Sequence, residues 1–331
     1  MSESAEQVPI SAVIPVHNGE KFIENSFKAV QENLLRHDEA IFIVNGTSDR
    51  TMKRLLQISN SESRVRIIEL ENAGLVNALN IGVQESRSKW IARFDVDDDY
   101  RSDRLSLQRK LISNETVAIF SDYQIVGSAN EDLGVIPSGV SHVPTTISLF
   151  GKNRTPHPAV VFSKDAFLES GGYKEEDFPA EDLGLWLRMT RAGEFCSVPL
   201  PLLSYRLHGN SVSLRHQKHS KEIARHLLRN IFIEEHTIQT AINLTQQIIE
   251  GYQGLPYADE RKLLFLFNTS QAISYSHNPH KEKIGAQKEI IKQVLHPSFV
   301  HAFLSLRSDL KARRNYRKEI WSQEKWDGNA Q

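Results

Sequence analysis

The pattern of apolar and polar positions predicts alternating strands and helices over the first two thirds of the chain. Short apolar or β-branched runs closed by turn residues are typical of strands, and the amphipathic segments between them are typical of helices. The predicted strands are 11–16, 40–44, 65–70, 90–96, 117–126, 157–162 and 203–207. The predicted helices are 20–33, a segment running from Asp49 towards Ser59, a segment opened by 72–74, 102–113, 164–170 and 180–191. This alternation favours an α/β fold with a mostly parallel central sheet flanked by helices.

Two regions depart from this alternation. Residues 127–156 are rich in Gly, Ser, Asn, Pro and Thr with little periodicity, so we expect a long loop there. From about Arg215 onward strand signals vanish, and apolar residues such as Ile223 and Leu227 recur at helical spacing. We therefore expect three parts, which are a disordered tail (1–8), an α/β domain (9–215) and an all-helical C-terminal appendage (216–331).

Composition places the chain among globular proteins. Its 331 residues, 40% of them hydrophobic, are enough to bury a full core. The longest aliphatic-aromatic stretch, 263–267, is far shorter than the roughly 18 residues of a membrane span, so we expect no transmembrane helix. Residues 1–9 lack the basic start and apolar centre of a secretion signal. Cys196 is the single cysteine, which fits a reducing, cytoplasmic setting.

The net charge of -1 conceals an uneven distribution along the chain. Residues 1–215 carry 23 Lys and Arg against 29 Asp and Glu, whereas residues 216–331 carry 17 against 12. The basic excess is concentrated in 307–318. Such a run is usually a solvated helix face, but it also fits peripheral contact with the anionic cytoplasmic face of a membrane. The C-terminal helices could equally form a homo-oligomer.

Residues 90–99 carry an apolar run directly into four aspartates, which are Asp95, Asp97, Asp98 and Asp99. In open α/β sheets, ligands bind outside the carboxyl ends of the strands, and carboxylate oxygens suit Mg²⁺ or Mn²⁺. The pattern therefore predicts a site for a divalent metal and a phosphate-bearing substrate. The alternative is a solvated turn whose acidic side chains cap the following helix.

Six sequence blocks carry a resemblance to a known family. They are Ser-Ala-Val-Ile-Pro-Val-His-Asn (11–18), Asn-Gly-Thr-Ser-Asp (45–49), Gly-Leu-x-x-Ala-Leu-Asn-x-Gly (74–82), Ile-Ala-Arg-x-Asp-x-Asp-Asp (91–98), Glu-Asp (181–182) and Tyr-Arg-x-His-x-x-Ser (205–211). In this order they resemble family 2 glycosyltransferases of the GT-A fold, a Rossmann-like architecture, over roughly residues 9–215. The C-terminal third lies outside the resemblance.

The resemblance implies a pocket for a nucleotide-sugar donor. Its donor-binding residues would be Pro15, Val16, His17, Asn18, Asn45, Asp49, Asn72, Arg93 and Asp95. Asp95 would face the ribose or the metal, and Asp97 would be the main protein ligand of Mn²⁺ or Mg²⁺. His208 would add a metal ligand or a phosphate contact, with a purely structural histidine as the alternative. A UDP-sugar is the default donor, although Asn45 stands where the family often has a carboxylate that reads uracil.

The resemblance also implies an inverting glycosyltransferase in which Asp182 is the general base and Glu181 orients the acceptor or the base. The product would be a glycan or glycolipid glycosylated at a hydroxyl, with no nucleic acid involved. The alternative for both acids is stabilisation of a helix N-terminus through the helix dipole. Two other functions remain open, a nucleotidyltransferase and a non-catalytic scaffold that binds nucleotide sugars. No Gly-rich triphosphate loop supports the nucleotidyltransferase.

Overall fold

The computed structural model describes residues 8–60, 62–127, 130–136, 138 and 155–207, together with some residues between 215 and 227. The described strands are β1 (Ile10–Val16), β2 (Glu39–Asn45), β3 (Val65–Leu70), β4 (Trp90–Arg93), β5 (Asp99–Tyr100), β6 (Thr116–Val126), β7 (Asp132–Ile136), β8 (Val161–Ser163) and β9 (Glu194–Arg206). The described α-helices are α1 (Ile23–Asn33), α2 (Thr51–Ser59), α3 (Leu75–Glu85), α4 (Arg104–Arg109), α6 (Lys164–Glu169) and α7 (Glu181–Met189).

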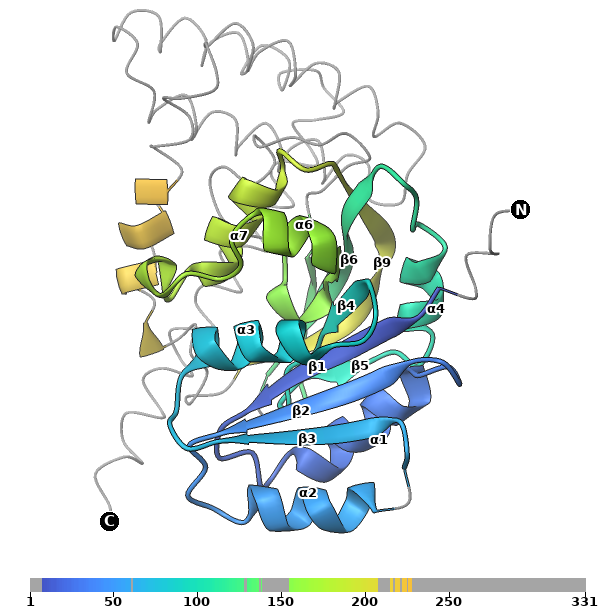
Figure 1. Ribbon diagram of the computed structural model, residues 1–331, viewed down its shortest axis with the longest axis vertical. Helices are drawn as coiled ribbons and strands as arrows, with labels where there is room; N and C mark the ends of the chain where they lie inside the picture. Colours follow the sequence, from blue (N-terminus) through green and yellow to red (C-terminus); the bar gives the residue numbers. More distant parts are fainter. Residues whose placement is uncertain are drawn as a thin grey trace, which may run out of the picture.

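The strands form one mixed sheet in the order β3-β2-β1-β4-β8-β6-β9-β5, with β7 paired to β6 (Figure 1). The first four strands of this order are parallel. β8 runs antiparallel to both β4 and β6, while β6 and β9 are parallel over a long register. The predicted α/β sheet flanked by helices is confirmed, and its second half adds the antiparallel pairs.

Helices cover both faces of the sheet, so the sheet separates two apolar cores. On one face, Ala12 and Ile14 of β1 pack in the core that contains α1, α2 and α4. On the other face, Val13 packs in the core that contains α3, α6 and α7. Because successive side chains of a strand point to opposite faces, a fully covered strand must be apolar at nearly every position. The unbroken apolar runs of β1 and β2 have this cause.

Helix α3 lies unusually close to β1, and a glycine makes this approach possible. A Cβ atom at Gly82 would lie 2.4 Å from Val13 Cγ1 and 3.2 Å from Ile43 Cγ1. Any side chain at this position would push the helix off the sheet. The last glycine of the 74–82 block is thus explained by packing.

The strands predicted at 11–16, 40–44 and 65–70 are confirmed within a residue or two at each end. The strand predicted at 90–96 ends earlier, at Arg93, and the chain then turns at Val96 and Asp97. The strand predicted at 157–162 is wrong in its first half, because His157–Ala159 form a 3-10 turn and β8 starts at Val161. Pro158 lacks the amide proton that a central strand needs.

Three other boundaries differ from the sequence-based expectation. The loop predicted at 127–156 contains β7 within its described part, and the helix predicted at 102–113 ends at Arg109. The strand predicted at 203–207 is the end of the 13-residue β9. Two prolines in β9 hide this long strand from the sequence pattern, since proline removes a ladder hydrogen bond. At Pro201 the pairing with β6 shifts register.

Most of the predicted helical appendage (216–331), including 307–318, lies outside the described residues, as does the tail 1–7. Residues 222–224 and 226–227 are helical, and Ile223, Ala224 and Leu227 pack against the core that contains α7. Within the described residues, no helix combines the length and the apolar character needed to cross a membrane.

A buried ion pair between Arg109 and Asp38 lies at the edge of the sheet where β1 and β2 start. Arg109 Nη2 lies 2.8 and 2.6 Å from the two carboxylate oxygens of Asp38, and both side chains are almost fully buried. Asp38 also accepts hydrogen bonds from the backbone N–H groups of Ile10 and Leu35. One carboxylate therefore joins β1, α4 and the loop before β2.

We expect Arg109→Met to lower the free energy of unfolding by about 3 to 5 kcal/mol, because it leaves the Asp38 carboxylate buried without its cation. Arg101→Met is the matched control. It removes one side of an exposed ion pair with Asp103, and such pairs contribute about 1 kcal/mol or less. Urea unfolding of both variants measures the difference. Equal losses in the two variants would contradict the role of Arg109.

Candidate active site

The loops after β1, β2, β3 and β4 leave the sheet at one edge, because the four strands are parallel and aligned (Figure 1). This edge is called the carboxyl edge below, and the opposite edge is called the amino edge. Most of the sequence-predicted site residues lie here. Pro15, Val16 and Asn45 are buried strand ends, His17, Asn18, Asp49 and Asn72 are exposed in the loops, and Arg93, Asp95 and Asp97 lie at or just after the end of β4.

Three carboxylates gather just beyond β4. Asp95, Asp97 and Asp98 each offer one oxygen, and these three oxygens lie within 4.8 Å of one another. The turn at Val96 and Asp97 folds the chain back on itself, which brings the three side chains together. Like charges at this separation repel, so the cluster requires positive charge or protonation to be stable.

Asp98 is the most buried of the three, with 5% of its surface exposed. Its Oδ1 accepts a hydrogen bond from the backbone N–H of Arg206 at 2.8 Å. Its Oδ2 is buried and has no hydrogen-bond partner among the described residues. Burial, followed by the charges of Asp95 and Asp97, raises the pKa of Asp98 well above its usual value. Asp98 Oδ2 is therefore an acceptor in need of a partner.

Arg93 supplies a fixed positive charge next to the cluster. It is 3% exposed, and its Nη2 donates to Asp95 Oδ1 at 2.6 Å while Nη1 donates to the carbonyl of Phe94. Burial alone would lower the pKa of Arg93, but the neighbouring Asp95 and Tyr100 raise it. Its Nε is buried and has no partner within the described part of the chain. One guanidinium thus offsets part of the repulsion among three carboxylates.

A second buried arginine, Arg104, packs against the residues that flank Asp95. The Arg104 guanidinium lies 4.3 Å from the Phe94 ring centroid and 5.0 Å from that of Tyr100. It donates to the Arg93 carbonyl at 2.9 Å, and burial lowers the pKa of Arg104 to about 10. Tyr100 Oη in turn accepts the backbone N–H of Asp95 at 2.6 Å. These contacts fix the backbone from which Asp95 projects.

Helix α7 brings two further acids to the site. Glu181 and Asp182 form its first turn, and Asp182 Oδ1 accepts the backbone N–H of Leu183 at 2.6 Å. Glu181 is 6% exposed, and burial, followed by the charge of Asp182, raises the pKa of Glu181 to about 8. Arg93 and Asp95 also act electrostatically on Glu181, so α7 and the end of β4 share one electrostatic environment.

A half-buried histidine, His157, and a buried tyrosine, Tyr173, lie next to these acids. His157 Nε2 and Tyr173 Oη are 2.8 Å apart, and the His157 ring packs against the edge of Trp186. Burial lowers the pKa of His157 well below its usual value, so the ring is neutral. Burial likewise raises the pKa of Tyr173, which lies within the field of Arg93 and Glu181.

The loops after β1 and β2 hold each other in place. Asn18 adopts a positive φ of 50°, and its Oδ1 accepts the backbone N–H of Ser48 at 2.9 Å. Asp49 Oδ1 accepts the Thr51 backbone N–H, and its Oδ2 accepts that of Glu20. Burial alone would raise the pKa of Asp49, but these hydrogen bonds lower it. Asp49 remains ionised and is engaged in shaping the loop.

Asn45 connects three loops through its side chain. Its Nδ2 donates to the Val16 carbonyl at 3.0 Å, and its Oδ1 accepts the Gly74 N–H at 3.2 Å. The next residue, Gly46, has a φ of +57°, and a Cβ there would lie 2.3 Å from the Ala73 backbone nitrogen. The side-chain amide of Asn45 is thus engaged in hydrogen bonds to the backbone of neighbouring loops. The backbone carbonyl of Asn45 is hydrogen-bonded to the His17 ring.

The acidic cluster fits a divalent cation. Three carboxylate oxygens converge, Asp98 Oδ2 lacks a partner among the described residues, and hard oxygen ligands are those that Mg²⁺ and Mn²⁺ prefer. His208, which the resemblance implies as a further metal ligand or a phosphate contact, lies outside the described residues.

Several contributors had no individual sequence signal. Asp98 belongs to the acidic run, but the sequence pattern gives it no role of its own. Its backbone and side chain are fixed by contact with Arg206, which lies 108 residues away along the chain. Arg206 Nη2 also pairs with Asp99 Oδ2 at 2.5 Å. Tyr100 and Arg104 looked like ordinary residues of a turn and a helix. Such long-range contacts have no spacing that a sequence pattern could detect.

Comparison with known sequences identifies related proteins. Residues 11–162 match the description "Glycosyl transferase family 2". The chain is 30% identical over 212 residues to "O-antigen biosynthesis glycosyltransferase WbnJ" of Escherichia coli, which covers 61% of this chain and 81% of that protein. An uncharacterized glycosyltransferase of Rickettsia conorii is 22% identical over 302 residues, covering 89% of this chain. The chain spans about half of that longer relative, 47% of its length.

Solved structures with the same fold include two proteins that were solved with bound sugar nucleotides. TarS of S. aureus matches with a TM-score of 0.55 at 13% identity, covering 83% of this chain and 50% of TarS, and its 1–349 form was solved with UDP-GlcNAc. The mannosyltransferase PcManGT from Pyrobaculum calidifontis, solved with GDP-Man and Mn²⁺, matches with a TM-score of 0.51 at 11% identity. It covers 95% of this chain and 84% of that protein. At these identities the likeness concerns the fold.

The raised pKa of Glu181 predicts a pH dependence of stability. The folded state holds a proton on Glu181 that the unfolded state, with a pKa near 4.5, has released, so this group makes the free energy of unfolding fall between pH 4.5 and about 8. Glu181→Gln should remove the contribution of this group, which is about 1.4 kcal/mol of unfolding free energy for each unit by which the pKa is raised. Urea unfolding across this range measures it, with exposed Glu169→Gln as the control. A fall in Glu181→Gln as steep as that of the wild type would refute the assignment, since Asp98, whose pKa is also raised, accounts only for the part that remains.

Proposed function

Since the chain belongs to glycosyl transferase family 2, we propose that it is an inverting, metal-dependent enzyme that moves a sugar from a nucleotide diphosphate sugar to a hydroxyl of a glycan or glycolipid. The fold is the GT-A fold, and the chain is a glycosyltransferase. The observation that carries the finer proposal is the convergence of Asp95, Asp97 and Asp98 in one electrostatic environment with Glu181 and Asp182.

Asp95, Asp97 and Asp98 would hold the cation, Mn²⁺ or Mg²⁺. A bound divalent ion neutralises the negative charge that develops on a diphosphate leaving group. Without it the carboxylates would repel the donor, because both carry negative charge. The unpartnered Asp98 Oδ2 supports adding Asp98 to the ligands expected from sequence. Arg93 would keep the Asp95 carboxylate oriented through their 2.6 Å contact.

The donor nucleotide would lie over the loops after β1, β2 and β3. Asn72 is exposed there and would contact the base, ribose or phosphates, whereas exposed His17 and Asn18 already bond Asn45, Ser48 and each other and would shape the surface against which the donor lies. Asn45 would position the pocket rather than touch the base, since its amide already bonds Val16 and Gly74. A UDP-sugar remains the proposed donor. The TarS complex with UDP-GlcNAc supports a sugar nucleotide in this fold, and the PcManGT complex supports one bound together with Mn²⁺.

Asp182 would be the general base of the transfer. The acceptor oxygen attacks the anomeric carbon, the bond from that carbon to the diphosphate oxygen breaks, and the hydroxyl proton passes to the Asp182 carboxylate. A single displacement inverts the anomeric centre. Glu181, with a pKa of about 8, is mostly protonated at neutral pH and would donate a hydrogen bond to the acceptor. Glu181 and Asp182 both lie in the first turn of α7, so the helix backbone fixes the position of both acids.

The acceptor side is supported by the relatives. WbnJ is named for O-antigen biosynthesis, so a hydroxyl of a growing surface glycan or its lipid-linked precursor is the proposed acceptor class. The basic run 307–318 would then hold the enzyme at the membrane that carries such acceptors, whereas helices of the same region could instead join two copies of the chain.

We expect release of nucleoside diphosphate from one sugar nucleotide in a screen of UDP-, GDP- and dTDP-sugars with Mn²⁺ or Mg²⁺. Asp97→Asn should lower the metal-dependent rate about 100-fold or more, because a cation ligand is lost. Asp182→Asn should lower kcat by about 10² to 10⁴ while donor affinity stays unchanged, because only proton transfer is impaired. Calorimetric titration with the donor separates the two effects.

Asp103→Asn is the matched control, since Asp103 is exposed and pairs with Arg101 away from the acidic cluster. Its rate should equal that of the wild type. Donor binding without any turnover would favour a scaffold. Release of pyrophosphate from a nucleoside triphosphate would favour a nucleotidyltransferase.

We expect deletion of 307–331 to reduce cosedimentation with anionic liposomes at low salt, because each Lys or Arg near an anionic surface contributes about 1 kcal/mol. Liposomes of neutral lipid are the control for non-electrostatic binding. Unchanged binding after the deletion would end the membrane proposal, and a loss of dimer in sedimentation experiments would favour oligomerisation.

A further inference from the structure

A polar cavity lies at the amino edge of the sheet, opposite the acidic cluster. Its volume is about 300 Å³, at the lower end of the usual range for small-ligand pockets. It is lined by the segment before β2 (36–39), by the start of β3 (63–66) and by the loop after α3 (87–88). Strands of six or seven residues separate the two edges by about 20 Å. The cavity is therefore distinct from the candidate active site.

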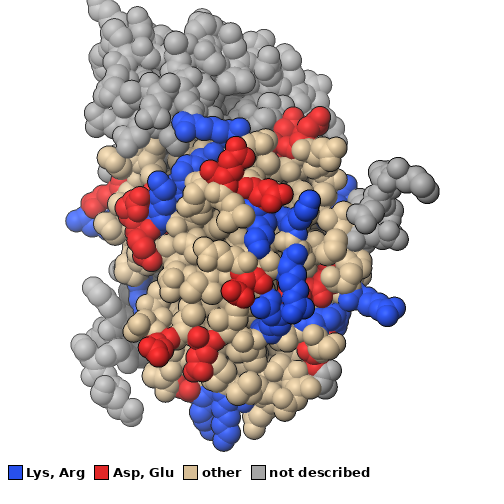
Figure 2. All heavy atoms as spheres, viewed as in Figure 1, with Lys and Arg blue, Asp and Glu red and all other residues tan. Residues whose placement is uncertain are grey.

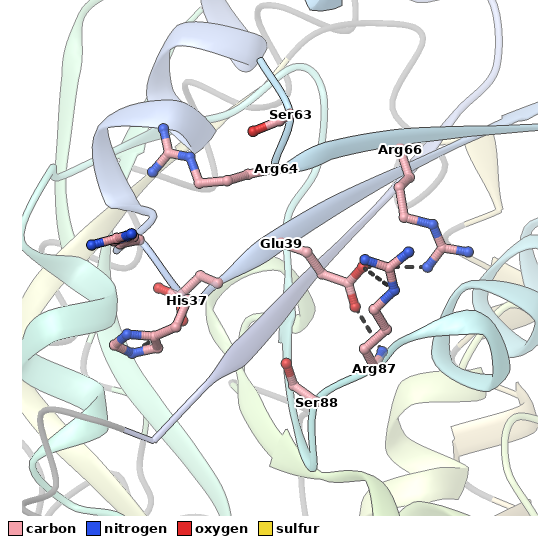
Figure 3. A pocket seen from close by; sticks show the side chains of 9 residues that line it. His37, Glu39, Ser63, Arg64, Arg66, Arg87 and Ser88 are labelled. Atoms are coloured by element: carbon pink, nitrogen blue, oxygen red, sulfur yellow. Dashed lines mark hydrogen bonds and ion pairs between the residues drawn. The ribbon is translucent and has the colours of Figure 1, made fainter.

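Four arginines line this cavity, Arg36, Arg64, Arg66 and Arg87, against two carboxylates, Asp38 and Glu39 (Figure 3). Figure 2 shows Lys and Arg side chains gathered over the same side of the molecule, near the starts of β2 and β3. In parallel βαβ units the helices end at the amino edge of the sheet, so the negative ends of their dipoles point here. The negative helix ends attract cations, and this attraction accounts for the presence of some of the arginines.

Arg64 and Arg66 have structural partners that account for them. Arg64 donates to both carboxylate oxygens of Glu62 and to the carbonyl of Leu34, just after α1. Arg66 donates to the carbonyl of Glu85, the last residue of α3, at 2.8 Å, and lies 3.3 Å from Glu39 Oε2. Both arginines satisfy carbonyl groups at helix ends, a common role of cations at that position.

Arg36 and Arg87 have no such explanation. Within the described part of the chain, Arg36 is exposed and makes no hydrogen bond or ion pair. The Arg87 side chain is 76% exposed, and its nearest acid is Glu39, whose Oε2 lies 3.9 Å from Arg87 Nε. Glu39 Oε1 is already occupied by Ser11 and by the Arg87 backbone N–H. Two guanidinium groups with unused donors therefore face the same cavity as two arginines that are already fixed.

Asp38 does not neutralise this surplus. Its carboxylate is taken by Arg109, so its charge is already balanced. His37 lies beside it, with Nε2 3.9 Å from Asp38 Oδ1, and Ser63 and Ser88 contribute small polar side chains to the wall. A cavity that offers spare guanidinium donors and hydroxyl-bearing walls, with its acids already paired, matches the needs of a tetrahedral oxyanion.

We propose that this cavity binds a phosphate group, with Arg36 and the loosely paired Arg87 as its main donors and Arg66 as a preorganised wall. The phosphate belongs either to a soluble phosphorylated molecule or to a lipid headgroup. The site lies away from the acidic cluster and does not depend on the function proposed above.

The test is calorimetric titration of the full chain with inorganic phosphate, in the presence of EDTA so that no divalent cation bridges phosphate to the acidic cluster. We expect saturable binding by the wild type. The double variant Arg36→Ala/Arg87→Ala should weaken it about tenfold or more, since charge-assisted hydrogen bonds are lost. Both side chains are exposed, and matching urea unfolding curves verify that the variant is folded.

The control Lys28→Ala/Lys53→Ala removes the same positive charge from exposed positions on α1 and α2 and should bind phosphate like the wild type. Absence of saturable binding by the wild type, or equal affinity of the wild type and the arginine variant, overturns the proposal. Equal weakening by the lysine control overturns it too, because binding would then follow net charge alone.

Cosedimentation with phosphatidylcholine vesicles, with and without phosphatidate, separates the two sources. If the arginine variant loses phosphatidate-dependent sedimentation relative to the lysine control, the phosphate is that of a lipid headgroup. If phosphate binding depends on the arginines and sedimentation does not, the ligand is a soluble phosphorylated molecule. Both outcomes support the site, and they differ in the source of the phosphate.

Discussion

The structure depends on how charged groups are accommodated at the two edges of a sheet that is covered on both faces. Helices occupy each face, so strand interiors must be apolar, and ionised side chains can enter the fold at the strand ends. Burying a charge there is costly unless an opposite charge or several hydrogen bonds compensate. Arg109 with Asp38 at the amino edge and Arg93 with Asp95 at the carboxyl edge meet this requirement.

The two edges differ in how complete that compensation is. At the amino edge the Asp38 carboxylate is fully satisfied, and the surplus charge is positive. At the carboxyl edge the surplus is negative, because the carboxylates of Asp95, Asp97 and Asp98 outnumber the buried guanidinium groups of Arg93 and Arg104. In addition, Asp98 Oδ2 lacks a partner among the described residues. Sites that bind ligands commonly retain such imbalances, since the ligand completes the charge balance.

Backbone geometry then sets what can approach the negative edge. The Asn45 amide, the close contact of Gly46 with Ala73 and the contact between Asn18 and Ser48 bind the loops after β1, β2 and β3 to one another. These loops cannot move separately without losing hydrogen bonds, so the surface that would receive a nucleotide is largely preformed. A preformed site loses less conformational entropy on binding. The rigid first turn of α7 brings Glu181 and Asp182 to the same region.

The sequence by itself determined the α/β alternation, the four parallel strands and the acidic run after Trp90–Arg93, because these follow from local periodicity and from turn residues. It also predicted Glu181 and Asp182 at a helix start. Tertiary structure alone decided the length of β9 and the pairing of β8, since pairing between distant segments overrides local propensity. It likewise decided that Asp98 is buried against Arg206 and that Asn45 is occupied by backbone groups. Burial and hydrogen bonding between residues far apart in the chain leave no spacing in the sequence, and they set the charge state of each site residue.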